Sequence, residues 1–115
     1  MDIQSLLPLA PRDLLILSVL SAGALHGYGI IREVEERSEE GVLIDPANLY
    51  RVLRRMSRDG WIREEEGPAE DAGRRRTYSI TTTGEAVLRA EVARLERLLG
   101  RVRPALAGGA RGRGA

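Results

Sequence analysis

The amino-acid sequence predicts a mainly α-helical fold with a small β-hairpin. Apolar residues recur at helical spacing in several separate segments, and a later segment alternates in the manner of paired strands. Gly and Pro mark the joins between these segments. With 115 residues, the chain is expected to form one domain rather than two.

The first predicted elements are each bounded by Gly or Pro residues. A mostly apolar helix is expected from about Arg12 to Ser21, and a second helix begins near Gly27. The single histidine, His26, stands at the start of the second helix, where we interpret it as a structural hydrogen-bond donor. The run 42–44 is apolar and β-branched, which is typical of a brief strand.

The third predicted helix begins at a strong local signal. Asp45 is suited to cap the free N–H groups of a first turn, and Pro46 fits the first helical position. The helix should run from Pro46 to about Arg58 and stop at the Asp-Gly pair that follows. Its apolar residues fall on one stripe at helical spacing, namely Leu49, Val52, Leu53 and Met56.

Past residue 60 the pattern indicates a hairpin and then a long helix. Residues 61–66 and 74–80 are expected to pair across a turn-rich, flexible loop, with Trp61 anchoring the hairpin to the core. A capping box at residues 82–85 predicts the start of the long helix, and Pro104 is expected to limit it.

The long helix carries apolar residues spaced by four and three in alternation, the period of a helix-pairing seam. One interpretation is that the seam folds back onto Leu14, Leu17 and Leu20 of its own chain. We favour a two-fold partner, because a single helix that trails a small domain cannot easily cover such a face. The seam consists of Leu88, Val92, Leu95, Leu99 and Val102.

The order of elements is that of a winged helix-turn-helix, an architecture that binds DNA in many of its uses. We therefore assign residues 1–81 to a winged helix-turn-helix DNA-binding domain and residues 82–104 to a C-terminal dimerisation helix. The Gly-rich, basic residues 105–115 are expected to form a disordered tail.

A second stripe on the third helix consists of arginine. It repeats the apolar spacing two residues later, about 200° around the helix, and so faces away from the core. Residues 46–60 carry four Arg and one Asp, a net charge of +3, whereas residues 32–45 carry two Arg and six acids, a net charge of −4. The stripe consists of Arg51, Arg54, Arg55 and Arg58.

This arginine stripe is either a solvated outer face or a surface that meets a polyanion. We favour the polyanion, because like charges repel one another unless an opposite charge relieves them. The helix would then enter a DNA major groove, with Arg51 as the base reader and Arg58 as a phosphate contact. Asn48, near the first turn, could bond an adenine edge.

Other candidate DNA contacts have an equally plain structural interpretation. The phenols of Tyr28 and Tyr50 can contact phosphate or can pack half-buried. The wing arginines can reach the DNA backbone or a minor groove, or they can pair with the wing carboxylates across the hairpin. These arginines are Arg74, Arg75 and Arg76, and the carboxylates are Glu64, Glu65, Glu66, Glu70 and Asp71.

Composition excludes several classes of site. The chain has no Cys and one His, which removes thiol nucleophiles, Cys-based metal sites and a multi-His site within one chain. No Gly-rich phosphate loop follows a strand, so we expect neither an enzyme nor a bound cofactor or metal.

The apolar run 14–24 follows a segment of net charge −1 and is too short to span a bilayer. We expect a cytoplasmic protein without a membrane segment.

The chain resembles a PadR-type transcriptional regulator over roughly residues 3 to 100. The resemblance is carried by residues 26–28, by Leu49 and Tyr50 with Leu53, by the Asp-Gly pair at 59–60, and by residues 78–81 with Gly84. It implies a winged-helix homodimer whose C-terminal helix packs against its partner and against the partner's N-terminal helix, where Leu6 and Leu7 lie. The resemblance maps the DNA contacts onto the third helix at Asn48, Tyr50, Arg51, Arg54 and Arg55, and onto the wing at Arg74, Arg75 and Arg76.

The resemblance also implies repression of nearby promoters, relieved when a small aromatic or hydrophobic compound binds near the dimer interface. No aromatic residue follows Tyr78, so the pattern favours an aliphatic effector site, or none, over one that stacks flat compounds. Arg51 and Thr77 also depart from the family pattern. The sequence therefore predicts a homodimeric, DNA-binding repressor of a pseudo-palindromic operator. The alternative is a winged-helix adaptor whose arginine stripe meets an acidic protein.

Overall fold

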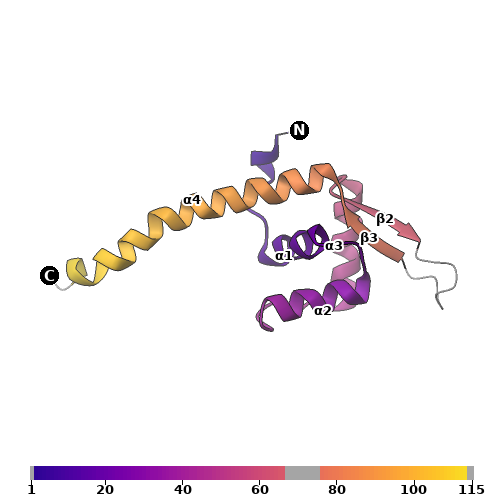
Figure 1. Cartoon of the computed structure of the whole chain (residues 1–115), viewed down its shortest axis with the longest axis horizontal. Helices are drawn as coiled ribbons and strands as arrows, with labels where there is room; N and C mark the ends of the chain where they lie inside the picture. Colours follow the sequence, from indigo (N-terminus) through magenta and orange to yellow (C-terminus); the bar gives the residue numbers. More distant parts are fainter. Residues whose placement is uncertain (1, 67–75, 114–115) are drawn as a thin grey trace.

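Three short helices and a small sheet form the body of the molecule, and one long helix extends away from it (Figure 1). The computed structural model describes residues 2–66 and 76–113. The predicted fold class is confirmed. The elements in chain order are the 3-10 helix η1 (Ile3–Leu6), α1 (Pro11–Ser21), β1 (Leu25–His26), α2 (Gly27–Arg37), α3 (Pro46–Arg58), β2 (Ile62–Glu66), β3 (Arg76–Ile80) and α4 (Thr82–Arg113).

The sheet has three antiparallel strands in the order β1-β3-β2. Its hairpin pairs Ile62 with Ile80 and Glu64 with Tyr78. Strand β1 was not predicted, since two residues are too few to show alternation; Leu25 pairs with Tyr78 far along the chain. The loop at 67–73 and the arginines Arg74 and Arg75 lie outside the described residues.

The predicted strand at 42–44 is wrong. These residues form no ladder; the Val42 N–H instead donates to the Ser38 hydroxyl at 3.0 Å, and Ile44 is buried in the core. An apolar, β-branched run can therefore serve burial alone, because a strand also needs a partner with free backbone groups.

Buried side chains from all three short helices meet the sheet and the start of α4 in one core. Helices α1 and α2 contribute aliphatic residues, and the predicted α3 stripe is buried as expected. Trp61 is buried, which agrees with its predicted anchoring role. The core includes Ile16, Leu17, Leu20, Ile30, Leu49, Leu53, Met56, Trp61 and Tyr78.

Helix α3 has the predicted bounds, because its start and stop signals are local. The Asp45 carboxylate accepts the Asn48 N–H at 2.9 Å, and Pro46 occupies the first turn. The backbone hydrogen bond from Asn48 is the largest influence that lowers the Asp45 pKa. The cap therefore stays ionised, as a helix N-terminus prefers.

The starts of α2 and α4 differ in detail from the sequence prediction. His26 caps α2 as an acceptor, not a donor: its Nδ1 accepts the Gly29 N–H at 3.1 Å. The cap of α4 is Thr81 rather than Thr82, since the Thr81 hydroxyl accepts the Gly84 N–H at 3.1 Å and donates to the Gly60 carbonyl at 2.6 Å. That hydroxyl links the end of the wing to the turn after α3.

Helix α4 does not end at Pro104, and the predicted disordered tail is wrong over residues 105–113. The helix continues through Pro104 to Arg113. Proline removes one N–H donor from a helix, but the surrounding side chains are exposed and water can bond the carbonyl that is left free. The first part of α4 packs on α1 and η1, and the remainder extends from the body (Figure 1).

Candidate nucleic-acid interface

The arginine stripe of α3 divides into groups with different surroundings. Arg51, Arg54 and Arg58 are exposed, whereas Arg55 is half-buried. Arg58 approaches its neighbour Asp59 only loosely, at 3.9 Å, and no ion pair involves Arg51 or Arg54 among the described residues. Three guanidinium groups of the stripe are therefore presented to solvent, as predicted.

The prediction that all four arginines project freely is wrong at Arg55. Its Nη2 forms an ion pair with Asp13, a carboxylate on α1 that is only 6% exposed. Arg12 also donates to Asp13, from Nε at 3.2 Å. A buried carboxylate needs such partners, so Arg55 fixes α3 against α1.

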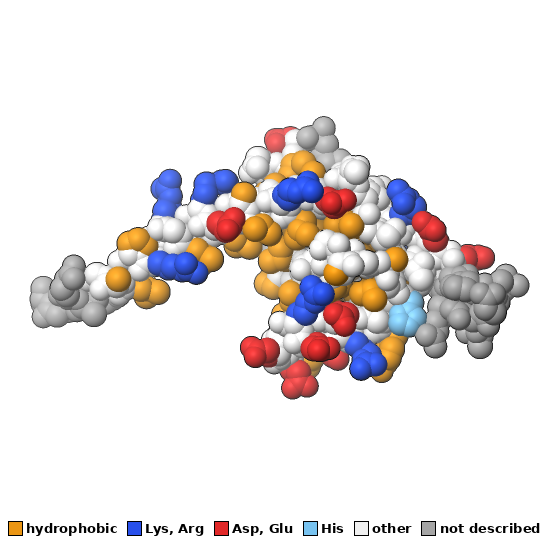
Figure 2. Space-filling view, in the orientation of Figure 1, with side chains coloured by type: hydrophobic (Ala, Val, Ile, Leu, Met, Phe, Trp, Pro, Cys, Tyr) orange, Lys and Arg blue, Asp and Glu red, His pale blue; other side chains and the backbone are white. Residues whose placement is uncertain are grey.

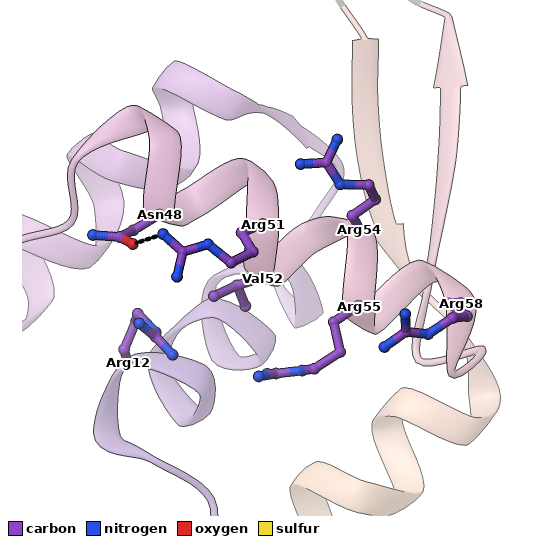
Figure 3. Close-up of a pocket in the computed structure, with 7 residues that line it drawn as sticks. All are labelled: Arg12, Asn48, Arg51, Val52, Arg54, Arg55 and Arg58. Atoms are coloured by element: carbon purple, nitrogen blue, oxygen red, sulfur yellow. Dashed lines mark hydrogen bonds between the residues drawn. The ribbon is translucent and has the colours of Figure 1, made fainter.

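Asn48 is engaged within its own turn rather than free to read a base. Its Nδ2 donates to the Asp45 carboxylate at 2.5 Å, and its Oδ1 accepts from Arg51 (Figure 3). An adenine contact would have to replace these bonds. The bond to Asn48 does hold the Arg51 side chain along the exposed face of α3, near the N-terminal end of the helix. In helices that read a major groove, the N-terminal residues are the ones that contact base edges.

Arg54 lies beside the strands of the wing (Figure 3). It lines a polar hollow of about 440 Å³ between α3 and the strands, together with Tyr50 and Ser57 from α3. The wing side of the hollow is formed by Glu64, Arg76 and Tyr78. The sequence did not indicate that α3 and the wing share a hollow, because the residues belong to separate elements.

The one wing arginine that the structure describes is paired with a carboxylate. Arg76 Nη1 donates to Glu64 at 2.8 Å, across the two strands. The hydroxyl of Tyr78 donates to the same carboxylate at 3.0 Å. Burial, followed by this bond to Glu64, raises the pKa of Tyr78 above its ordinary value, so the phenol keeps its proton. For Arg76, cross-strand pairing with Glu64 is therefore what the structure shows.

The two candidate tyrosines are both exposed. Tyr28, at the start of α2, is 65% exposed, with Arg32 lying 5.9 Å from the centre of its ring. The ring of Tyr50 lies close against Gly27, where a Cβ would meet its hydroxyl at 2.5 Å. A side chain at residue 27 would therefore displace the phenol of Tyr50 from its place against the start of α2.

The predicted dimer residues separate into two sets. Leu6, Leu7 and Leu88 pack partly against the core of their own chain. Further along α4 most of the apolar side chains are exposed in the single chain. Two of them, Leu98 and Leu106, were not part of the predicted seam. Leu95 is half-buried, and the exposed residues are Val92, Leu98, Leu99, Val102 and Leu106.

Figure 2 shows how unevenly charge and apolar surface are distributed. Acidic side chains gather over the end of α2, and apolar side chains follow the extended part of α4. The acidic group includes Glu35, Glu36, Glu39 and Glu40, which line a shallow hollow with Arg32. The molecule therefore separates the acidic end of α2 from the basic face of α3.

A family model for the transcriptional regulator PadR-like family matches residues 16–90, which run from the middle of α1 through α2, α3 and the wing to the start of α4. The chain belongs to the PadR-like family. Members of this family are transcription regulators rather than enzymes.

The family assignment agrees with individual relatives. The chain is 36% identical over 90 residues to an uncharacterized 37.1 kDa protein in transposon TN4556 of Streptomyces fradiae, covering 78% of this chain but 24% of that protein. A PadR family transcription regulator from Clostridium difficile is 30% identical, with a TM-score of 0.69 over 86% of this chain and 100% of that one. The chain thus spans about a quarter of the first relative.

The Bacillus subtilis PadR, solved in complex with operator DNA, has the same fold. Its TM-score is 0.66 at 21% identity, covering 74% of this chain and 48% of that chain. Among the described residues of this PadR-family chain, no helix combines the length and hydropathy that crossing a membrane requires.

Proposed function

We propose that this PadR-family regulator is a sequence-specific, homodimeric DNA-binding repressor. The observation that carries the proposal is the exposed set of guanidinium groups on α3, Arg51, Arg54 and Arg58, beside a two-stranded wing. Guanidinium groups form forked contacts with guanine edges and with phosphates. A capped, 13-residue amphipathic helix is the element that fits a major groove.

The likeness to the operator-bound Bacillus subtilis protein supports this use of the surface. In the proposal, Arg51 reads bases, and Arg54 and Arg58 contact bases or phosphates. Arg55 acts by positioning α3, because its guanidinium is held by Asp13. Tyr28, Tyr50 and Asn48 lie beside these arginines as secondary contacts, and Arg74 to Arg76 extend the surface along the wing.

The homodimer is proposed from α4. Its exposed apolar residues repeat at the spacing of a helix-pairing seam. In the described part of the chain, no other element covers these residues on the extended part of the helix. A second copy supplies a matching apolar face by two-fold symmetry. Two copies of α3 would then read a pseudo-palindromic operator, in the cytoplasm where the DNA is.

Release by a small hydrophobic compound at the dimer interface completes the proposal. The exposed side chains of α4 are aliphatic, and no aromatic residue follows Tyr78. We therefore infer an aliphatic compound rather than a flat, stacked one. Such a compound would act by binding the free dimer better than the DNA-bound dimer.

A salt titration on random-sequence duplex DNA tests DNA binding itself. If phosphates are contacted, the logarithm of affinity falls linearly with the logarithm of salt concentration, with a slope of about −0.9 per neutralised phosphate. The absence of any binding at low salt would contradict the proposal and favour the adaptor alternative, in which the arginines meet an acidic protein.

Specific readout is tested on the DNA upstream of the gene that encodes this chain. Protection mapping should locate an operator there, and Arg51→Ala or Arg54→Ala should weaken operator binding by about 1–3 kcal/mol. The matched control is Arg37→Ala, which removes an exposed arginine at the far end of α2. Unchanged affinity of both α3 variants would contradict the assignment of α3 as the reading element.

A further inference from the structure

A second hollow, of about 330 Å³, lies between the first turn of α1 and the arginine stripe of α3 (Figure 3). Five arginines line it, four from α3 and one, Arg12, from α1. Among the described residues no carboxylate lines this hollow. Arg12 was not predicted from the sequence to belong to the site, because only the fold brings the start of α1 beside α3.

The donors around this hollow exceed the acceptors. Asp13 bonds two of the arginines that line it: one carboxylate oxygen accepts from Arg12 Nε and the other accepts from Arg55. Two guanidinium groups thus share one carboxylate, which leaves one positive charge in excess. Arg12 uses only Nε in this bond, so both of its terminal nitrogens have no hydrogen-bond partner in the described part of the chain.

Arg51 and Arg58 add to this excess. Arg51 bonds only to the neutral amide of Asn48, and Arg58 makes only the long contact with Asp59. Cationic donors come from two helices, and each oxygen of the one carboxylate that they share already accepts a hydrogen bond. Such a set of donors suits a compact anion with several acceptor oxygens. A phosphate group has that chemistry, and an arginine fork matches it.

We propose that this hollow holds one backbone phosphate of the bound DNA and that Arg12 is its contact from α1. The proposal rests on the proposed DNA-binding function and adds an element to it. A contact from α1 fixes the angle at which α3 enters the groove, since phosphate contacts set orientation while base contacts set sequence. Asp13 then serves as a positioning residue that aims Arg12 and Arg55 together.

The test compares salt titrations of the full chain on random-sequence duplex. Arg12→Ala should reduce the steepness of the log–log slope by about 0.9 for each phosphate that the bound chain no longer neutralises. It should also weaken binding to all sequences by the same factor. Arg12→Lys should restore the slope, because it keeps the charge at the same position. Arg37→Ala, the control, should leave slope and affinity unchanged.

The outcomes separate this inference from the function on which it rests. If wild type shows no salt-dependent duplex binding, the proposed function fails. If wild type binds steeply but Arg12→Ala has the wild-type slope, the phosphate contact is refuted while DNA binding stands. Equal loss of affinity in Arg12→Lys and Arg12→Ala at unchanged thermal stability also overturns it, because a phosphate contact depends on charge.

A further arm distinguishes DNA phosphate from free phosphate. Inorganic phosphate is added to the wild-type complex and compared with sodium chloride at equal ionic strength. Equal displacement by the two salts supports a backbone phosphate held as part of the duplex. Stronger displacement by phosphate, absent in Arg12→Ala, would assign the hollow to a free anion and overturn the DNA contact.

Discussion

Glu64 is a carboxylate on the surface that we propose meets DNA. It faces the hollow between α3 and the wing, where it accepts bonds from both Arg76 and Tyr78. Its charge opposes that of the nearby Arg54 and would repel a phosphate. Because the ion pair with Arg76 is largely exposed, it contributes little to folding. We therefore expect Glu64 to limit indiscriminate binding to DNA more than it stabilises the wing.

Glu64→Gln should therefore raise affinity for random-sequence duplex at low salt. One unit charge at about 7 Å from a phosphate contributes about 0.6 kcal/mol in water, or roughly a threefold change in affinity. The amide oxygen can still accept from Tyr78, so thermal stability should stay nearly constant. Glu65→Gln is the control, since it removes the same charge from the opposite face of β2. Equal gains in both variants would attribute the effect to net charge rather than to Glu64.

At the scale of the secondary-structure elements, the N-terminal segment is fastened to α4 by one buried carboxylate. Glu91 is 1% exposed and accepts the Leu9 N–H at 2.8 Å. Arg94 donates to the same carboxylate from Nε at 2.5 Å and from Nη2 at 2.9 Å. These bonds satisfy the buried charge and tie two segments that lie far apart in the sequence.

Glu91→Gln should lower the free energy of unfolding by about 1–3 kcal/mol, because it leaves Arg94 without its charged partner and weakens the bond to Leu9. Hydrogen exchange at the Leu9 amide should accelerate more than exchange in α2 or α3. Glu96→Gln, an exposed change on the same helix, serves as the control. Unaltered protection of Leu9 would show that the carboxylate does not hold the segment.

The ion pair between Glu91 and Arg94 makes the stability of the fold depend on pH. The hydrogen bond from Arg94 is the largest influence that lowers the pKa of Glu91 in the folded chain. A lowered folded-state pKa contributes stability above the unfolded value, and that contribution is lost as pH falls through the folded value. Wild type should therefore lose more stability than Glu91→Gln below about pH 4.5, measured by urea unfolding at each pH.

Elements with local signals were the ones that the sequence predicted well. Helix α3 has its cap, its proline and its apolar stripe within 14 consecutive residues, so its bounds were correct. Strand β1 depends on a partner about 50 residues away, and the run 42–44 looks like a strand but has no partner. The prediction that the long helix ends at Pro104 was wrong because an exposed helix tolerates the loss of one backbone hydrogen bond.

The candidate site was predicted only in part, for the same reason. The helical period placed Arg51, Arg54 and Arg58 on an exposed face correctly. Arg55 has the same period, but its partner Asp13 lies 42 residues earlier and no local pattern connects them. Arg12 and Glu64 entered the site only through the fold. The helical period of the sequence predicts which side of a helix is exposed, whereas tertiary contacts decide which charges on that side form ion pairs.

For the whole molecule, the separation of its surfaces favours assembly in pairs. The exposed arginines Arg51, Arg54 and Arg58 lie on α3, while the exposed apolar residues lie on the extended part of α4 (Figures 1 and 2). Pairing through α4 would therefore leave both basic faces available. Two half-sites bound by one dimer give a large gain in affinity, since the second contact becomes intramolecular.

Leu99→Arg should convert the proposed dimer into monomers without unfolding the chain, because Leu99 is already exposed in a single copy. Sedimentation at micromolar concentration should show half the wild-type mass, with an unchanged circular dichroism spectrum. The salt slope on duplex DNA should fall to about half, because a monomer neutralises half as many phosphates. Arg97→Glu alters charge about 200° around the same helix and should remain dimeric. A dimer that persists in Leu99→Arg with a full slope would place the pairing surface elsewhere on the molecule.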